Sequence, residues 1–181
     1  MRRVAGVIVA AALFGLVTAW VKDPGGSGLG SAYELRSSLG NLSAPWVLLA
    51  FFAGARARRP VGGAVLGSAA TAVALFAFYV FGAAAVDIGL ARELAANRLY
   101  FEGGVLSGPL AGALGAWWAR ARSVRASLVA GILLAGEPFA AAAYGLLRDA
   151  VSRGVYGLEL ALGLAACGIP LIRRALTRTP G

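Results

Sequence analysis

The chain has 181 residues, of which 59% are hydrophobic, and its mean hydropathy of +0.76 is too high for a soluble domain of this size. Its net charge of +9 comes from short basic clusters between apolar runs, which argues against nucleic-acid binding because such proteins gather positive charge on one face. The sequence has no His, which excludes Ser-His-Asp triads, HExxH zinc sites and His-ligated haem. The one cysteine, Cys167, cannot form an intrachain disulfide.

Apolar runs along the chain predict an all-α integral membrane protein that forms one polytopic domain over residues 1–181. A helix needs about 20 apolar residues to cross ~30 Å of hydrocarbon, where lipid offers the backbone no other hydrogen-bond partners. We expect a short interfacial helix at residues 86–99. We also expect six transmembrane helices, at residues 4–21, 41–55, 61–85, 103–119, 126–147 and 155–172.

The first apolar run follows Arg2-Arg3, so a cleavable signal peptide is the alternative to a retained first helix. The run from Val4 to Val21 is longer than the roughly 7–15 residues typical of a signal peptide's apolar segment. Because further spans follow it, we expect a retained helix.

A short pattern occurs twice with the same spacing. Leu42-Ser43-Ala44-Pro45 precedes an apolar run that ends at Arg56, and Leu106-Ser107-Gly108-Pro109 precedes one that ends at Arg120. Ser and Pro favour the first turn of a helix, where the hydroxyl can cap and the missing Pro N–H costs least. The pattern predicts tandem parallel repeats of a helical hairpin, in which Ser43, Pro45, Ser107 and Pro109 lie near one interface. A pocket at the outer leaflet is the alternative role for these four residues.

Basic residues are distributed unevenly between the loops. The N-terminus, residues 56–60, residues 120–125 and the C-terminal tail carry eleven Arg residues and no acidic ones. The other loops mix six basic with six acidic residues. Because Lys and Arg concentrate on the cytoplasmic side, we expect a multi-pass plasma-membrane protein with both termini in the cytoplasm.

These motifs resemble those of a known family. Asn41-Leu42-Ser43-Ala44-Pro45-Trp46, with the apolar run and Arg cluster that follow, is similar to a bacterial integral-membrane family described as domain of unknown function number 6518. Ser107-Gly108-Pro109, leading to Gly115-Ala116-Trp117-Trp118, belongs to the same likeness, which extends from the first span to Glu137. The resemblance implies a small multi-helix membrane protein and assigns no catalytic or binding residue.

Glu137 is the foremost candidate for a functional residue because it lies near the centre of the predicted fifth span. A charged carboxylate there costs on the order of 3 kcal/mol, so the side chain should face the bundle or a cavity, where burial favours its neutral form. Tyr144 and Arg148 follow on the same helical stripe. The functional interpretation is a proton- or cation-responsive site. The structural alternative is a protonated Glu bonded to a hydroxyl or to the carbonyl that Pro138 leaves without a donor.

Glu159 and Tyr79 are further candidates for a ligand or proton site. Glu159 is expected near the outer end of the sixth span, where Arg153 or Arg148 would neutralise it. Tyr79, near the end of the third span, is expected mainly as an aromatic-belt or packing residue.

Three classes of function are compatible with these features. The first is a solute-binding or transport-related component with an outward-opening cavity near Glu137. Six helices with cytoplasmic ends also resemble the substrate-binding subunits of energy-coupling-factor vitamin transporters. The second is an assembly or regulatory subunit that binds another membrane protein, or a second copy, through Gly/Ala-rich helix faces. An enzyme ranks last, because the sequence lacks His and any acidic pair at helical spacing. The expected surroundings are bilayer lipid, with no nucleic acid, metal or cofactor.

Overall fold

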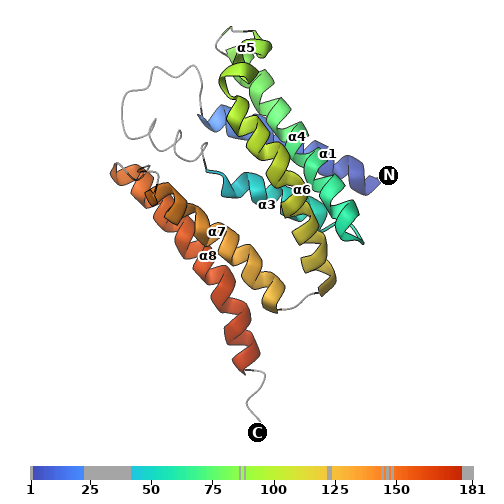
Figure 1. Cartoon of the computed structure of the whole chain (residues 1–181), viewed down its shortest axis with the longest axis vertical. Helices are drawn as coiled ribbons and strands as arrows, with labels where there is room; N and C mark the ends of the chain where they lie inside the picture. Colours follow the sequence, from blue (N-terminus) through green and yellow to red (C-terminus); the bar gives the residue numbers. More distant parts are fainter. Residues whose placement is uncertain are drawn as a thin grey trace. The chain divides into compact units, whose positions relative to one another are not determined.

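The computed structural model describes residues 2–22, 42–85, 87, 89–121, 124–143, 145, 147 and 149–176. Within these residues the predicted all-α class is confirmed, since they contain helices and no β-strand (Figure 1). The helices are α1 (Arg2–Lys22), α3 (Ala44–Gly54), α4 (Pro60–Ala85), α5 (Leu90–Ala96), α6 (Arg98–Ala121), α7 (Val124–Ala143) and α8 (Ala150–Leu176).

Three helical segments are long and apolar enough to cross a membrane: Val4–Lys22, Pro60–Ala85 and Ala150–Ile169. Two shorter segments, Ala44–Gly54 and Gly131–Ala143, are also apolar. Large hydrophobic side chains are exposed all along these helices, and a soluble monomer rarely leaves so much apolar surface uncovered. Length and surface together indicate a membrane protein.

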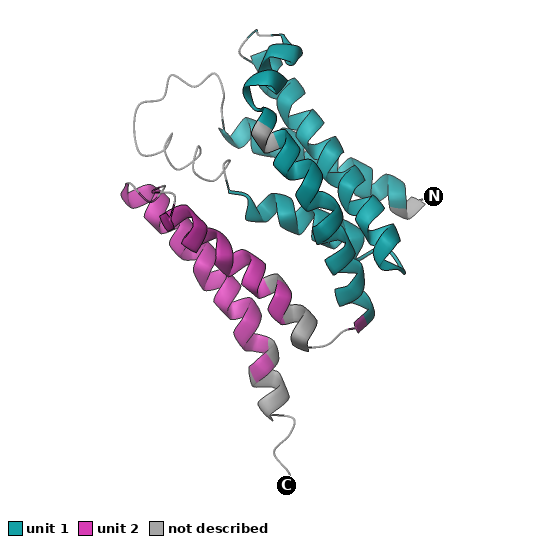
Figure 2. Ribbon diagram, viewed as in Figure 1, with its two compact units in different colours: residues 1–120 teal, residues 121–181 magenta. Residues whose placement is uncertain are grey.

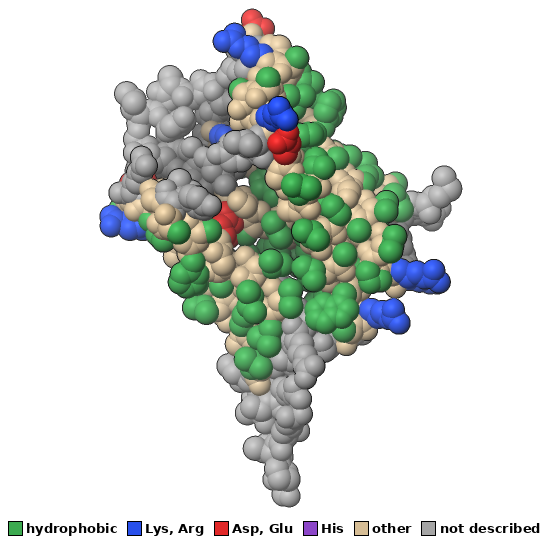
Figure 3. Space-filling model, in the orientation of Figure 1, with side chains coloured by type: hydrophobic (Ala, Val, Ile, Leu, Met, Phe, Trp, Pro, Cys, Tyr) green, Lys and Arg blue, Asp and Glu red, His purple; other side chains and the backbone are tan. Residues whose placement is uncertain are grey.

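The helices group into two compact units, Met1–Arg120 and Ala121–Gly181 (Figure 2). Unit 1 contains α1, α3, α4, α5 and α6 except its last residue, and unit 2 contains α7 and α8. In unit 1, Figure 3 shows charged side chains at both ends and hydrophobic side chains over the surface between them. That banded surface suits a molecule that meets water at its ends and lipid along its sides.

Small side chains bring α1 close to α4 in unit 1. Ala11 of α1 packs in one core with Ala70 and Ala74 of α4, to which α3 contributes Ala53. A Cβ atom at Gly15 of α1 would overlap the Ala74 carbonyl, so this approach requires glycine. The first helix is therefore part of the core of unit 1.

A row of glycines brings α6 against α4 and α3. A Cβ atom at Gly63 or Gly67 of α4 would overlap backbone atoms of Gly112, and one at Gly115 would overlap the Phe51 carbonyl of α3. Glycine at a helix crossing lets two backbones approach closely. These small-residue faces are thus occupied within the chain itself.

Unit 2 is a helical hairpin in which α7 packs against α8. A Cβ atom at Gly131 of α7 would lie 2.8 Å from the Gly163 carbonyl of α8, so the two backbones are close at this level. Farther toward the start of α7, the Cys167 thiol of α8 lies 3.7 Å from the Leu128 carbonyl that it bonds. This register places residues before Gly131 beside residues after Gly163, as an antiparallel pair requires.

The two copies of the Ser-x-Pro pattern have different local structures. Ser43 precedes α3 and Pro45 lies in its first turn, as predicted, but the Ser43 side chain forms no capping bond. Pro109 lies in the interior of α6, and the prediction that it marks a helix start is wrong. The helix begins at Arg98, whose guanidinium Nε bonds Glu102 one turn later, at 2.5 Å. The Ser107 hydroxyl bonds the Gly104 carbonyl within the same helix, at 3.2 Å.

The helix predicted at residues 126–147 ends early, at Ala143. Gly145 adopts a positive φ of 68°, and its N–H donates to the Ala142 carbonyl at 3.0 Å. A glycine in this left-handed conformation ends many helices, which explains the shorter α7. The predicted helix at residues 86–99 is also shorter and is found as Leu90–Ala96.

The last helix begins five residues before its predicted start. Asp149 precedes α8 and accepts hydrogen bonds from the Ser152 backbone N–H and from the Ser152 hydroxyl, both at 2.7 Å. These two bonds, the backbone one first, hold the pKa of Asp149 below its ordinary value because they favour the carboxylate. Asp149 therefore acts as the N-cap that extends α8 to Ala150.

Candidate functional site

Unit 1 contains a cavity of about 580 Å³, a volume typical of small-molecule sites. Its lining comes from the end of α1, the residues at the start of α3, the middle of α4, Asn97 and the first half of α6. Leu42, Val47 and Leu75 contribute aliphatic wall. The cavity is thus enclosed by α1, α3, α4 and α6 together with Asn97, the residue that joins α5 to α6.

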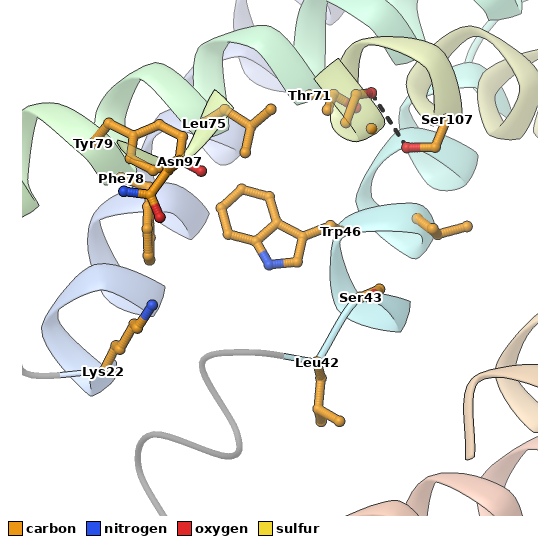
Figure 4. A pocket seen from close by; sticks show the side chains of 13 residues that line it. Lys22, Leu42, Ser43, Trp46, Thr71, Leu75, Phe78, Tyr79, Asn97 and Ser107 are labelled. Atoms are coloured by element: carbon orange, nitrogen blue, oxygen red, sulfur yellow. Dashed lines mark hydrogen bonds between the residues drawn. The ribbon is translucent and has the colours of Figure 1, made fainter. Parts of the chain in front are cut away.

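Aromatic rings form much of the wall. The Trp46 indole of α3 packs edge-on against Phe14 of α1 and Phe78 of α4, with centroid separations of 5.1 and 5.5 Å. The ring centroids of Phe78 and Tyr79 are 5.2 Å apart. Figure 4 shows the Trp46 indole between Lys22 and Asn97 on one side and Thr71 and Ser107 on the other. Such rings offer a rigid apolar surface for a flat or apolar ligand.

Lys22 supplies the one charge among the described lining residues. Its Nζ lies 5.6 Å from the centroid of the Phe78 ring, within range of a cation–π contact. It is also the last residue of α1, where the helix dipole favours a cation. The sequence contains no other Lys.

Thr71 of α4 carries a buried hydroxyl that forms no hydrogen bond to any described residue. The residue is 2% exposed and lines the cavity. Two other helical hydroxyls behave differently: Thr18 bonds the Phe14 carbonyl at 2.8 Å, and Ser68 bonds the Ala64 carbonyl at 2.9 Å. A hydroxyl in an apolar helix ordinarily bonds back to the preceding turn in this way. Thr71 thus lines the cavity with a buried hydroxyl that has no hydrogen-bond partner among the described residues.

In unit 2, the Glu137 carboxyl of α7 lies within hydrogen-bonding distance of the Glu159 carboxyl of α8. Glu159 is 5% exposed, and no N–H or O–H donor of the described residues reaches either of its oxygens. Glu137 is half-buried. Two ionised carboxylates only accept hydrogen bonds, so this contact closes only when one group carries a proton.

The predicted site residues fall in different places. Tyr79, Ser43 and Ser107 line the cavity of unit 1, whereas Pro45 and Pro109 do not. Tyr144 and Arg148 lie outside the described residues.

The position expected for Glu159 was wrong. Because α8 begins at Ala150, Glu159 lies near the middle of the candidate span Ala150–Ile169, not near its outer end. Arg153 does not neutralise it; its guanidinium Nε donates to the Asp149 carbonyl at 3.2 Å.

Three residues of the cavity, Lys22, Thr71 and Asn97, were missed by sequence reasoning. A lone Lys among Arg residues and a Thr in the middle of an Ala-rich span are the signals that could have found the first two. The carboxyl pair also had a signal. Glu137 and Glu159 stand equally far before and after position 148, so a hairpin turning there places them at one level.

Comparisons of the chain with models of known families, with curated proteins and with solved structures gave no significant match. The resemblance to domain of unknown function number 6518 therefore stays a prediction, and the geometry of the two sites carries the functional argument.

Proposed function

We propose that unit 1 binds a small organic solute with an apolar or aromatic body and an anionic group, as a solute-binding or transport-related membrane component. The cavity of about 580 Å³ carries this proposal. Trp46 and Phe78 would hold the body of the solute, and Lys22 would attract its charged group. The described lining has no acidic side chain, which disfavours a cationic solute.

The hydroxyl of Thr71 supports binding more than it supports packing. A buried hydroxyl without a partner costs about 1–3 kcal/mol of folding stability, a cost that a ligand acceptor or donor would offset. Asn97 is less available, because its amide already donates to the Glu93 carbonyl and carboxylate, each at 3.0 Å. Thr71 and Lys22 are therefore the two groups that we expect to select the solute.

We further propose that the protein crosses the plasma membrane six times with both termini in the cytoplasm. The uneven distribution of Arg between the loops supports this topology. Since Lys22 ends the first span and lines the cavity, the cavity would then open to the outside. An outward opening suits capture of a solute from the medium.

The tandem repeat is proposed as part of the same architecture. Residues 42–82 should superpose on residues 106–146 by rotation about an axis near the membrane normal. The different positions of Pro45 and Pro109 within their helices limit the match to the helical stretches that follow them. An experimental structure in lipid that places these prolines on opposite sides of the membrane would contradict the repeat.

The alternative is an assembly or regulatory subunit that binds another membrane protein or a second copy. It ranks second because Gly63, Gly67 and Gly112 already face each other within unit 1. Gly6 of α1 still has an open face, with nothing within 4 Å of a Cβ placed there, so this helix would be the contact surface.

The test measures small molecules retained by the purified full chain in lipid nanodiscs, using mass spectrometry of organic extracts. Thr71→Val replaces the hydroxyl by a methyl group of similar size, so it should keep the fold and retain roughly 2- to 10-fold less of the bound compound, equivalent to about 0.5–1.5 kcal/mol. Lys22→Gln should lower retention at least as much. The matched controls are Thr18→Val, whose hydroxyl bonds its own helix, and Arg58→Gln, an exposed cation in the loop between α3 and α4. Equal retention by all five proteins, or no retained compound, would overturn the proposal.

A further inference from the structure

The Glu137–Glu159 contact joins two acidic side chains inside a tightly packed helical pair. Glu159 is 5% exposed and lies near the middle of the candidate span Ala150–Ile169. It has no described donor, although its neighbour across the hairpin is another carboxyl group. We propose that this pair is a proton-binding site, in which Glu159 holds the proton and donates it in a hydrogen bond to Glu137.

Burial decides which of the two groups holds the proton. An isolated carboxylate in an apolar interior is far less stable than the neutral acid, and Glu159 is the more deeply buried partner. Glu137 is half-buried, so it is the less enclosed of the two side chains. A single proton on Glu159 gives its hydroxyl an acceptor and removes one of two adjacent charges.

The fold holds the two groups at the same level. Gly163 lies one turn after Glu159, and a Cβ atom there would lie 2.6 Å from the Ala135 nitrogen of α7. Pro138, which is buried, lacks an N–H and so leaves the Leu134 carbonyl without its usual helical donor. This stretch of α7, which holds Glu137, therefore includes one carbonyl acceptor without its usual helical donor.

No N–H or O–H donor of the described residues reaches Glu159, the more buried member of the pair. Tyr156 is buried one turn before Glu159 on α8, and Cys167 lies two turns after it and bonds the Leu128 carbonyl. Arg153 is exposed and bonds the Asp149 carbonyl. Among the described residues, no group of three acidic, Cys or His side chains is arranged to hold a metal ion.

Infrared spectroscopy of the full chain in lipid nanodiscs at pH 7 tests the proposal, because a protonated carboxyl has a carbonyl band that carboxylates lack. The wild type should show this band, and Glu159→Gln should lose it. Glu137→Gln and Glu137→Leu should keep the band but shift its frequency, upward in the Leu variant, because the acceptor is weakened or removed. Glu102→Gln, at an exposed residue paired with Arg98, is the control and should leave the band unchanged.

Circular dichroism of each variant checks that the helices remain folded. A wild type without the band, or a band that survives Glu159→Gln, would overturn the assignment of the proton. A band whose frequency is the same in wild type and both Glu137 variants would overturn the pairing, whatever the behaviour of Glu159→Gln. None of these infrared results depends on the cavity in unit 1. The proton site can therefore be refuted without refuting the proposed solute site, and the reverse also holds.

Discussion

Replacing Gly112 by Ala tests whether α6 needs glycine where it crosses α4. The new Cβ atom would lie 2.8 Å from the Gly67 Cα and would overlap the Gly63 carbonyl. Because two carbon atoms prefer about 3.5–4.0 Å, the helices must separate by roughly 1 Å. Overpacking of this kind costs ~1–3 kcal/mol, and the higher helix propensity of Ala returns up to ~1 kcal/mol.

Gly103→Ala is the matched control on the same helix, since nothing lies within 4 Å of a Cβ atom at that position. It changes helix propensity alone, so the difference between the two variants isolates the overpacking cost of about 1–3 kcal/mol. Reversible unfolding in mixed detergent and dodecyl sulfate micelles, followed by circular dichroism, measures both free energies. Free energies for Gly112→Ala and Gly103→Ala that agree within about 0.5 kcal/mol would refute the close crossing of α4 and α6.

Two further predictions concern the loops. With Cys167 replaced, a cysteine at Ser27 should react with an impermeant reagent added to intact cells and one at Ser123 should not; labelling of Ser123 from outside would reject the proposed topology. Asp149→Ala should speed hydrogen exchange in the first turn of α8, because it removes the bonds from Ser152. The pKa of Asp149 is lowered in the folded chain, so its contribution is complete above the ordinary value of 3.8 and is lost as pH falls below it. Unchanged exchange in the variant, or no pH dependence in the wild type, would show that this cap is not needed.

The sequence located the helices well because their signals are local. An apolar run that follows Arg56, Arg58 and Arg59 and stops before Asp87 specifies α4 almost to its ends, and the structure has it at Pro60–Ala85. The start of α6 was predicted wrongly because one sequence pattern is compatible with two local structures. The same Ser-x-Pro pattern begins α3 but lies inside α6, because residues 98–108 are helical whereas Leu42 and Ser43 precede α3.

The cavity could not be predicted in the same way, since its lining is distant in sequence. Lys22 and Ser107 are separated by most of unit 1, and neither has a pattern that indicates the other. Tyr79 was expected as a packing residue and does contact the Phe78 ring, yet it also lines the cavity. Packing of four helices, rather than any one motif, decides which side chains share a space.

Thr71 and Glu159 are both buried polar side chains in apolar helices, and this shared feature bears on their function. Each lies near the middle of a candidate span, Thr71 in Pro60–Ala85 and Glu159 in Ala150–Ile169. Each is at least nine-tenths buried, and no N–H or O–H donor of the described residues reaches the side-chain oxygens of either residue. A helix that needed only to pack would have Ala or Leu at these positions and would be more stable, because an unsatisfied buried polar group costs about 1–3 kcal/mol. Stability therefore gives no reason for either side chain, whereas the proposed solute beside Thr71 and the proposed proton on Glu159 would each supply a hydrogen bond.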